Sequence, residues 1–152
     1  MSRLVLALCA AAALCAVPVV AQESRATRAQ AEAMVKKGVE ALRTMGRERT
    51  FSEITAPSRT FVDRDLYLAV YDLHGKCLAH GQNAKQVGQD LIDVMDPDGK
   101  PFVKERVELA KSKGKFWQDY KFTDPLTKTV LPKQMYCELA GDVVVCGGVY
   151  KS

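Results

Sequence analysis

The chain has 152 residues, with 22 Lys and Arg against 18 Asp and Glu, and a formal net charge of +4. This length suits one domain. The mild positive excess is spread among acidic residues, so the composition excludes a concentrated basic footprint and we expect no nucleic acid partner.

The first residues form a separate unit. Arg3 precedes an apolar run over 4–16, and Pro18 and the small residues 19–21 follow. We interpret 1–21 as a signal peptide that sends the rest of the chain, 22–152, to the periplasm or outside the cell. The alternative is an uncleaved membrane anchor, although the apolar run is short for a membrane span.

The segment 24–46 is predicted to be one long helix. It contains no proline, and Ala31, Val35, Leu42 and Met45 form an apolar stripe at helical spacing, with Gly38 among them. The small residues Ala31 and Gly38 suit close contact with a sheet. A further helical turn is predicted at 50–55, with Pro57 ending it.

A β-hairpin is predicted at 66–81. The strand 66–71 is apolar or aromatic throughout, which is typical of a central strand covered on both faces. Residues 72–75 form the turn and 76–80 the return strand. A hairpin cannot bury such a strand alone, so we expect more strands and a covering layer.

The stretch 82–100 is predicted to be irregular, with one helical turn at 83–87 and a turn at Asp96-Pro97-Asp98-Gly99. Four of its apolar side chains are expected to be buried: Leu91, Ile92, Val94 and Met95. A second helix is predicted from Pro101 to Gly114. Its buried face is expected to consist of Phe102, Val103, Val107 and Ala110.

Three strands are predicted in the last third of the chain, at 116–123, 133–139 and 143–150. Gly141-Asp142 joins the last two as a two-residue turn, with Gly at the position that a type II′ turn requires. The chain therefore reads as a long helix, two strands, a helical insert and three strands. This order predicts an α+β fold with five strands.

Three cysteines follow residue 21: Cys77, Cys137 and Cys146. With Gly141-Asp142 as the loop, Cys137 and Cys146 face each other at a non-hydrogen-bonded pair, where Cα atoms approach to about 4.5 Å. A cross-strand disulfide is one expectation for this pair. Two small buried thiols are the other.

At this point the sequence resembles a known family. The segments DLYLAVYDLHGKCLAHG, VGQDLIDVMDPDGKPFVKERVELAKSKG, FWQDYKF and GDVVVCGGVYK resemble, in order and spacing, the single Cache domain of the second type. The resemblance covers about 51–151 and the preceding helix. It implies a PAS-like antiparallel sheet of five strands, with a long N-terminal helix packed on it. Members of that family mostly form extracytoplasmic sensors of chemoreceptors and histidine kinases, and they bind small molecules, often short carboxylates.

Candidate pocket residues are those that can donate hydrogen bonds to a carboxylate or enclose its apolar part. They are Tyr67, Tyr71, His80, Trp117, Tyr120, Lys133 and Tyr136. The resemblance adds Val87, Leu91 and Phe102 as walls. For each aromatic residue the alternative is an ordinary core or rim position.

We expect neither a metal nor another cofactor. Cys77, His80, Cys137 and Cys146 match the ligand types of a zinc site, but residues 77 and 80 are three apart on a strand and are expected to point to opposite faces. Asp96-Pro97-Asp98-Gly99 lacks the remaining ligand positions of a calcium loop. No nucleophile with a recognisable base is present, so we do not expect an enzyme.

The sequence therefore predicts an exported, stand-alone sensor domain that binds a short carboxylate or similar small organic ligand and signals through a membrane receptor or kinase partner. A structural or interaction domain without a ligand, which forms a homodimer or docks through its N-terminal helix, is the alternative. A thiol-redox function would rest only on the spare cysteine.

Overall fold

The computed structural model describes residues 25–56 and 60–151. The predicted signal peptide and the predicted helix end at Pro57 lie outside these residues. The described elements are α1 (Arg28–Met45), α2 (Arg47–Thr55), β1 (Val62–Asp63), β2 (Leu66–Asp72), β3 (Cys77–His80), η1 (Ala84–Gln86), α3 (Phe102–Lys113), β4 (Lys115–Thr123), β5 (Val130–Ala140) and β6 (Val143–Tyr150).

The long helix α1 begins and ends at local signals. The Thr27 hydroxyl accepts from the backbone N–H of Gln30, and the Gln30 side chain accepts from the backbone N–H of Thr27, which is a complete capping box. Gly46, at φ +81°, ends α1 and starts α2. The second helix is therefore longer than the predicted turn at 50–55, because it begins directly after this glycine.

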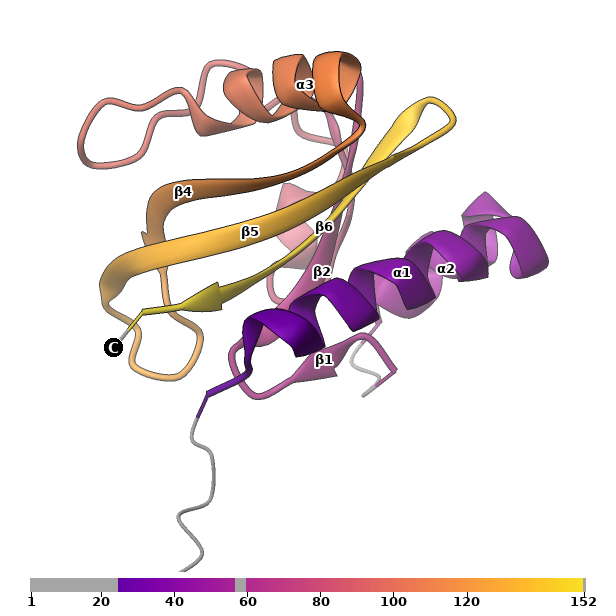
Figure 1. The fold of residues 1–152 in the computed structure, drawn as a ribbon, viewed down its shortest axis with the longest axis horizontal. Coiled ribbons are helices and arrows are strands. Elements are labelled where there is room, and N and C mark those ends of the chain that lie inside the picture. Colours follow the sequence, from indigo (N-terminus) through magenta and orange to yellow (C-terminus); the bar gives the residue numbers. More distant parts are fainter. Residues whose placement is uncertain (1–24, 57–59, 152) are drawn as a thin grey trace, which may run out of the picture.

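The sheet is antiparallel, with strand order β1-β2-β6-β5-β4, and β3 pairs with the same edge of β2 farther along. Figure 1 shows the sheet between two helical layers, with α1 on one side and α3 on the other. Residues 66–71 of β2 are all buried, as expected for a strand covered on both faces. The predicted PAS-like α+β fold is confirmed, with the short strand β1 as a sixth strand that the sequence analysis missed.

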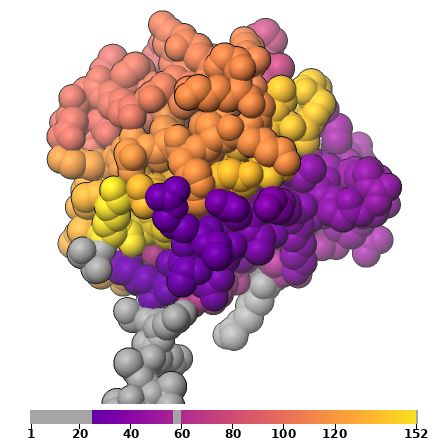
Figure 2. All heavy atoms as spheres, in the orientation of Figure 1, coloured from indigo at the N-terminus to yellow at the C-terminus, as the bar shows by residue number. Residues whose placement is uncertain are grey.

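The helix α1 lies very close to the sheet face that it covers. A Cβ on Gly38 would lie 2.7 Å from Cδ1 of Leu68, and one on Gly147 would lie 3.2 Å from Cγ2 of Val35. Glycine on the helix and glycine on the strand therefore let α1 approach the sheet closely, as predicted for Gly38. In Figure 2 the indigo and purple atoms of α1 lie directly against the orange and yellow atoms of the C-terminal strands.

A β-bulge in β3 overturns one expectation. Ala69 pairs with His80 and Tyr71 pairs with Cys77, so Leu78 is an extra residue in the ladder. Cys77 and His80 consequently project to the same face of the sheet, the face under α3. The prediction that they point to opposite faces was wrong, because a count of three residues assumes an unbroken ladder.

The segment between η1 and α3 also differs from the expectation. Leu91 and Ile92 are partly buried, whereas Val94 and Met95 are 40% and 61% exposed. The prediction that all four are buried was wrong. The backbone N–H of Leu91 donates to the carbonyl of Gly75, and the turn that follows, closed by the Val94 N–H on the Leu91 carbonyl, leaves Val94 and Met95 at the surface. The Asp96 carboxylate fixes this segment to β4 by accepting from the backbone N–H groups of Lys100 and Lys121.

The last hairpin has the predicted register. Ala140 pairs with Val143, and Cys137 lies opposite Cys146. The structure joins these two cysteines by a disulfide, with Cα atoms 4.2 Å apart. Gly141 adopts φ +64° at the turn, which a side chain would disfavour.

Candidate functional site

A small enclosed cavity lies between the sheet and α3. Its volume is about 30 Å³, which is room for about two water molecules. The wall is mostly aromatic, with one imidazole and one amide among the rings. The lining residues are Tyr67, Tyr71, His80, Gln86, Leu91, Val94, Phe102, Tyr120, Phe122 and Met135.

A larger, open hollow of about 310 Å³ adjoins this cavity. The two spaces share four wall residues: Tyr67, His80, Gln86 and Phe122. Movement of these shared side chains would connect the cavity to solvent. A small solute therefore has a short route into the enclosed space.

Arg106 lies against the cavity and is fully buried. Its guanidinium carbon is 5.0–5.4 Å from the ring centres of Tyr71, Phe102 and Tyr120, which line the cavity. Nε donates to Oε1 of Gln118 at 3.0 Å. Within the part of the chain that the structure describes, Nη1 and Nη2 have no hydrogen-bond partner. A buried cation in this state lacks an anion.

Lys133 is a second fully buried basic side chain on this face. Its Nζ donates to the phenol oxygens of Tyr67 at 2.9 Å and Tyr150 at 3.2 Å. Burial, together with the positive charge of Arg106, holds the pKa of the Lys133 amine well below its usual range.

His80 is fixed in one tautomer. Its Nδ1 accepts from the backbone N–H groups of Gln82 at 3.2 Å and Asn83 at 3.0 Å, so the ring hydrogen is on Nε2. Burial, and then the charges of Lys133 and Arg106, lower the pKa of His80 to about 3. The imidazole is therefore neutral at pH 7, and it stays an N–H donor beside Tyr67, with ring centres 5.1 Å apart.

The tyrosines of the site are donors as well. Burial raises the pKa of the Tyr67 and Tyr71 hydroxyls, and also that of Tyr120. All three phenols therefore keep their hydrogen at neutral pH. The Tyr120 hydroxyl donates to the sulfur of Met135 at 3.4 Å, a weak acceptor that a stronger one could replace.

Four of the seven predicted side chains line the cavity: Tyr67, Tyr71, His80 and Tyr120. Lys133 does not line it, but its Nζ donates to the Tyr67 hydroxyl, which does. We call the cavity, together with the buried Arg106 and Lys133 behind its wall, the chamber. Of the three predicted walls, Leu91 and Phe102 line the cavity. Val87 is 37% exposed and belongs to a different surface groove.

The structure does not bring Trp117 and Tyr136 into the chamber. Both lie on the face that α1 covers, with ring centres 5.3 Å apart, and Trp117 donates to Glu32 of α1 at 3.3 Å. The reason is strand alternation: Trp117 is three residues from Tyr120, and Tyr136 is three from Lys133, so each pair projects to opposite faces. Grouping them with the other five residues was an error in the sequence analysis.

Arg106 is the residue that sequence reasoning missed. A charged residue on a helix is usually solvated, but Arg106 lies three residues after Val103 and four before Ala110, in the middle of the predicted buried face of α3. Helical spacing of the apolar residues could therefore have identified it as a buried cation.

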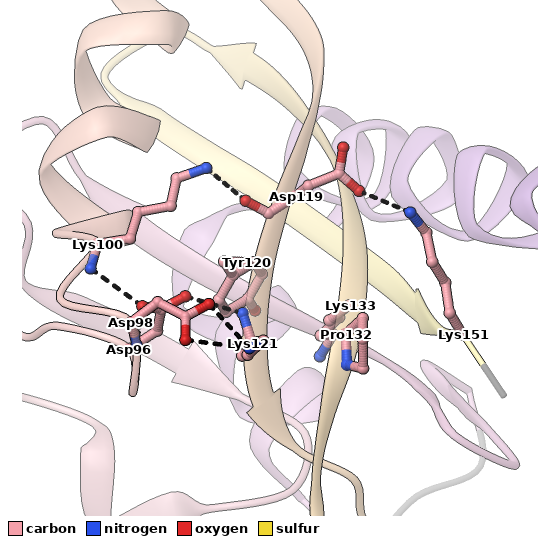
Figure 3. Close-up of a pocket in the computed structure, with 9 residues that line it drawn as sticks. All are labelled: Asp96, Asp98, Lys100, Asp119, Tyr120, Lys121, Pro132, Lys133 and Lys151. Carbon is pink, nitrogen blue, oxygen red and sulfur yellow. Dashed lines mark hydrogen bonds and ion pairs between the residues drawn. The ribbon is translucent and has the colours of Figure 1, made fainter.

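A surface cleft of about 260 Å³ on the other side of Tyr120 and Lys133 has a different character (Figure 3). Its acidic and basic side chains pair with one another: Lys121 with Asp98 at 2.9 Å, and Lys151 with Asp119 at 3.3 Å. Charges in the cleft are thus already compensated, whereas the guanidinium of Arg106 is not.

No group of three or more metal-ligating side chains occurs in the described part of the chain. Cys77, which the bulge turns toward this face, is buried, and burial raises its thiol pKa to about 11. That pKa disfavours the thiolate that redox chemistry needs. None of the helices within 25–56 and 60–151 is long and apolar enough to cross a membrane.

Comparison with known proteins gives a consistent result. Residues 10–152 match the single Cache domain 2 family. The methyl-accepting chemotaxis protein McpP of Pseudomonas putida is 31% identical over 104 residues, which are 68% of this chain and 19% of that protein. The chain thus spans about a fifth of the length of this curated relative.

Two solved structures are similar in fold. One is a Cache chemosensory domain reported as a structural basis for carboxylic acid recognition, with a TM-score of 0.69 and 24% identity over 82% of this chain and 92% of that one. The other is a periplasmic sensor domain of a chemotaxis protein, with a TM-score of 0.65 and 25% identity over 82% of this chain and 90% of that one.

Proposed function

This chain belongs to the single Cache domain 2 family, and on that premise we propose that it is a sensor domain that binds a short carboxylate in the chamber between the sheet and α3. The observation that carries this proposal is the Arg106 guanidinium, which is fully buried and has two nitrogens without partners in the described residues. A carboxylate can accept from both nitrogens at once.

The other groups of the chamber fit the same ligand. The neutral His80 imidazole and the phenols of Tyr67 and Tyr71 supply further donors. Phe102 and Phe122 supply apolar walls for a short hydrocarbon tail. The small volume favours ligands of the size of acetate or propionate, which would enter after small side-chain shifts.

The proposed setting is the periplasm, as the signal peptide interpretation of 1–21 and the chemotaxis relatives support. The domain would pass its bound state to a membrane receptor or kinase partner. The outer face of α1 is charged and carries local ion pairs such as Lys36–Glu32 and Arg43–Glu40. This face suits a wet, weak contact better than a tight dimer.

Thermal unfolding of the purified chain tests the proposal. We expect acetate or propionate at millimolar concentration to raise the melting temperature, because binding to the folded state alone stabilises it by about 2.7 kcal/mol at 100 times Kd. Acetamide and propionamide have the same shape without the charge and should give no shift, and sodium chloride controls for ionic strength. A panel of short acids without any shift, or equal shifts from the amides, would contradict the proposal.

A further inference from the structure

Lys133 is held in an unusual environment for a lysine. The amine is fully buried, and Nζ lies 4.0 Å from the ring centre of Tyr67 and 4.6 Å from that of Tyr150. It donates two hydrogen bonds, one to each phenol oxygen. Two donors are the full set of a neutral amine, whereas an ammonium has three.

Titratable and charged groups face this amine from every element packed around it. They are Tyr67 on β2, His80 on β3, Arg106 on α3, Tyr120 on β4, Tyr150 on β6, and the carboxylates of Asp65 and Asp124. Tyr67, Tyr120 and Tyr150 are neutral phenols. Among these named groups, Arg106 is the one that carries a positive charge in the empty site.

The two carboxylates are engaged elsewhere. Arg25 Nη2 donates to Asp124 at 2.9 Å, and Arg25 Nη1 lies 3.5 Å from Asp65. Asp65 also accepts from the backbone N–H of Ala26 at 2.7 Å and that of Tyr150 at 3.2 Å. Among the described residues, no carboxylate lies within ion-pair distance of the Lys133 amine.

These contacts explain why the amine stays neutral in the empty site. Protonation would create a second fully buried cation without a carboxylate partner, and the positive charge of Arg106 would oppose it. A bound carboxylate would supply the missing negative charge and reverse that balance. His80 is a poor receiver for the proton, because its Nδ1 already accepts two backbone N–H groups.

We propose that the site takes up one proton with each carboxylate that it binds, and that Lys133 receives this proton. The inference rests on the proposed function and adds a regulation to it. In the balance, a carboxylate anion and one proton from solvent enter, the amine becomes an ammonium, and the net charge of the chamber is unchanged. No electron transfer and no further reactant is needed.

The consequence is a definite pH dependence. The empty site is unprotonated and the occupied site is protonated, so the affinity rises as pH falls. Between the amine pKa values of the two states, Kd should increase tenfold for each unit of rising pH. An exported sensor of this kind would report the carboxylate more strongly in an acidified medium.

Isothermal titration calorimetry with propionate at pH 7.5, in phosphate and in Tris buffer, measures the proton uptake directly. The difference in heat between buffers should correspond to one proton per bound ligand in the wild-type chain and to none in Lys133→Met, a substitution that keeps the length of the side chain. Lys104→Met, at an exposed position on α3, is the matched control and should keep the uptake of one proton.

The outcomes separate the two proposals. Propionate binding without a buffer-dependent heat, or with a Kd that does not change between pH 6.5 and 8.5, would overturn the proton uptake and leave the sensor function standing. Uptake that persists in Lys133→Met would overturn the assignment to Lys133. If no short acid binds in either buffer, the sensor function itself fails. The wild-type pH profile decides the point even where the Lys133 variant does not fold.

Discussion

Replacement of Arg106 by methionine should separate stability from binding. Methionine keeps the unbranched stem that packs among the rings of Tyr71, Phe102 and Tyr120, but it removes the charge and all five N–H donors. In the folded chain without ligand, the guanidinium has one hydrogen bond, to Gln118. Its other contacts are with the rings of Tyr71, Phe102 and Tyr120, and with the phenol groups of the two tyrosines.

The structure sets the size of each effect. Loss of the bond to Gln118 costs about 1.5–3 kcal/mol, and the ring contacts add about 0.5–2 kcal/mol. Relief from burying an uncompensated cation is worth several kcal/mol in the opposite direction. We therefore expect the free energy of unfolding to change by less than about 2 kcal/mol. Loss of a buried charge partner should weaken carboxylate binding by about 2–5 kcal/mol, which is about 30- to 5,000-fold in Kd.

Urea denaturation gives the first quantity, and calorimetry with propionate gives the second. Arg43→Met is the matched control. It also removes one arginine charge, but from an exposed position on α1 outside the chamber, so it should leave Kd unchanged. A Kd for Arg106→Met within threefold of the wild-type value would refute the role of Arg106 as anchor. A loss of unfolding free energy above about 4 kcal/mol would instead show that the guanidinium is a structural element.

Three further predictions concern stability. Gly148→Ala should lower the free energy of unfolding by about 1–3 kcal/mol and also weaken carboxylate binding. The reason is that the added Cβ would lie 2.7 Å from the backbone oxygen of Gln134 and 2.8 Å from Cε of Lys133. If neither the urea midpoint nor the Kd changes, this packing argument is wrong. Replacing both Cys137 and Cys146 by alanine should lower the free energy of unfolding by about 2.6 kcal/mol in the loop-entropy description, measured by urea denaturation with and without reductant. A variant as stable as the oxidised wild-type chain would show that the disulfide does not stabilise the fold. Because His80 has a pKa of about 3 when folded and about 6.5 when unfolded, the unfolded chain binds the proton first, so His80 should lower the free energy of unfolding by about 2 kcal/mol from pH 7.5 to pH 5. Lys133, whose pKa the fold also lowers, adds a fall of its own. His80→Asn should therefore reduce the total fall by about 2 kcal/mol, and equal falls in the two chains would refute this role of His80.

The sequence alone determined the architecture. Patterns that repeat over short distances fixed it: the fully apolar strand 66–71, the alternation after residue 115, and the stripe of α1 with Gly38. The two-residue turn sets the register of the last hairpin, so counting residues outward from the turn places Cys137 opposite Cys146. Such features depend on residues near one another in the chain, and helix and strand periods describe them well.

The composition of the chamber was only partly determined in this way. Spacing alone would have excluded Trp117, and the helical stripe would have included Arg106. Both were within reach of the sequence. The ligand roles of Tyr67, Tyr71, His80, Tyr120 and Lys133 stay predictions until binding is measured.

Only the tertiary structure decided how the polar groups meet. The bulge at Leu78 places Cys77 and His80 on the same face of the sheet. No pattern in the local sequence predicts this extra residue in the ladder. Burial and the absence of a described anionic partner give Arg106 its role, and these are properties of what surrounds a side chain rather than of the side chain itself. The physical reason is that periodicity is set within one segment, whereas the charge balance of a cavity depends on all the segments that enclose it.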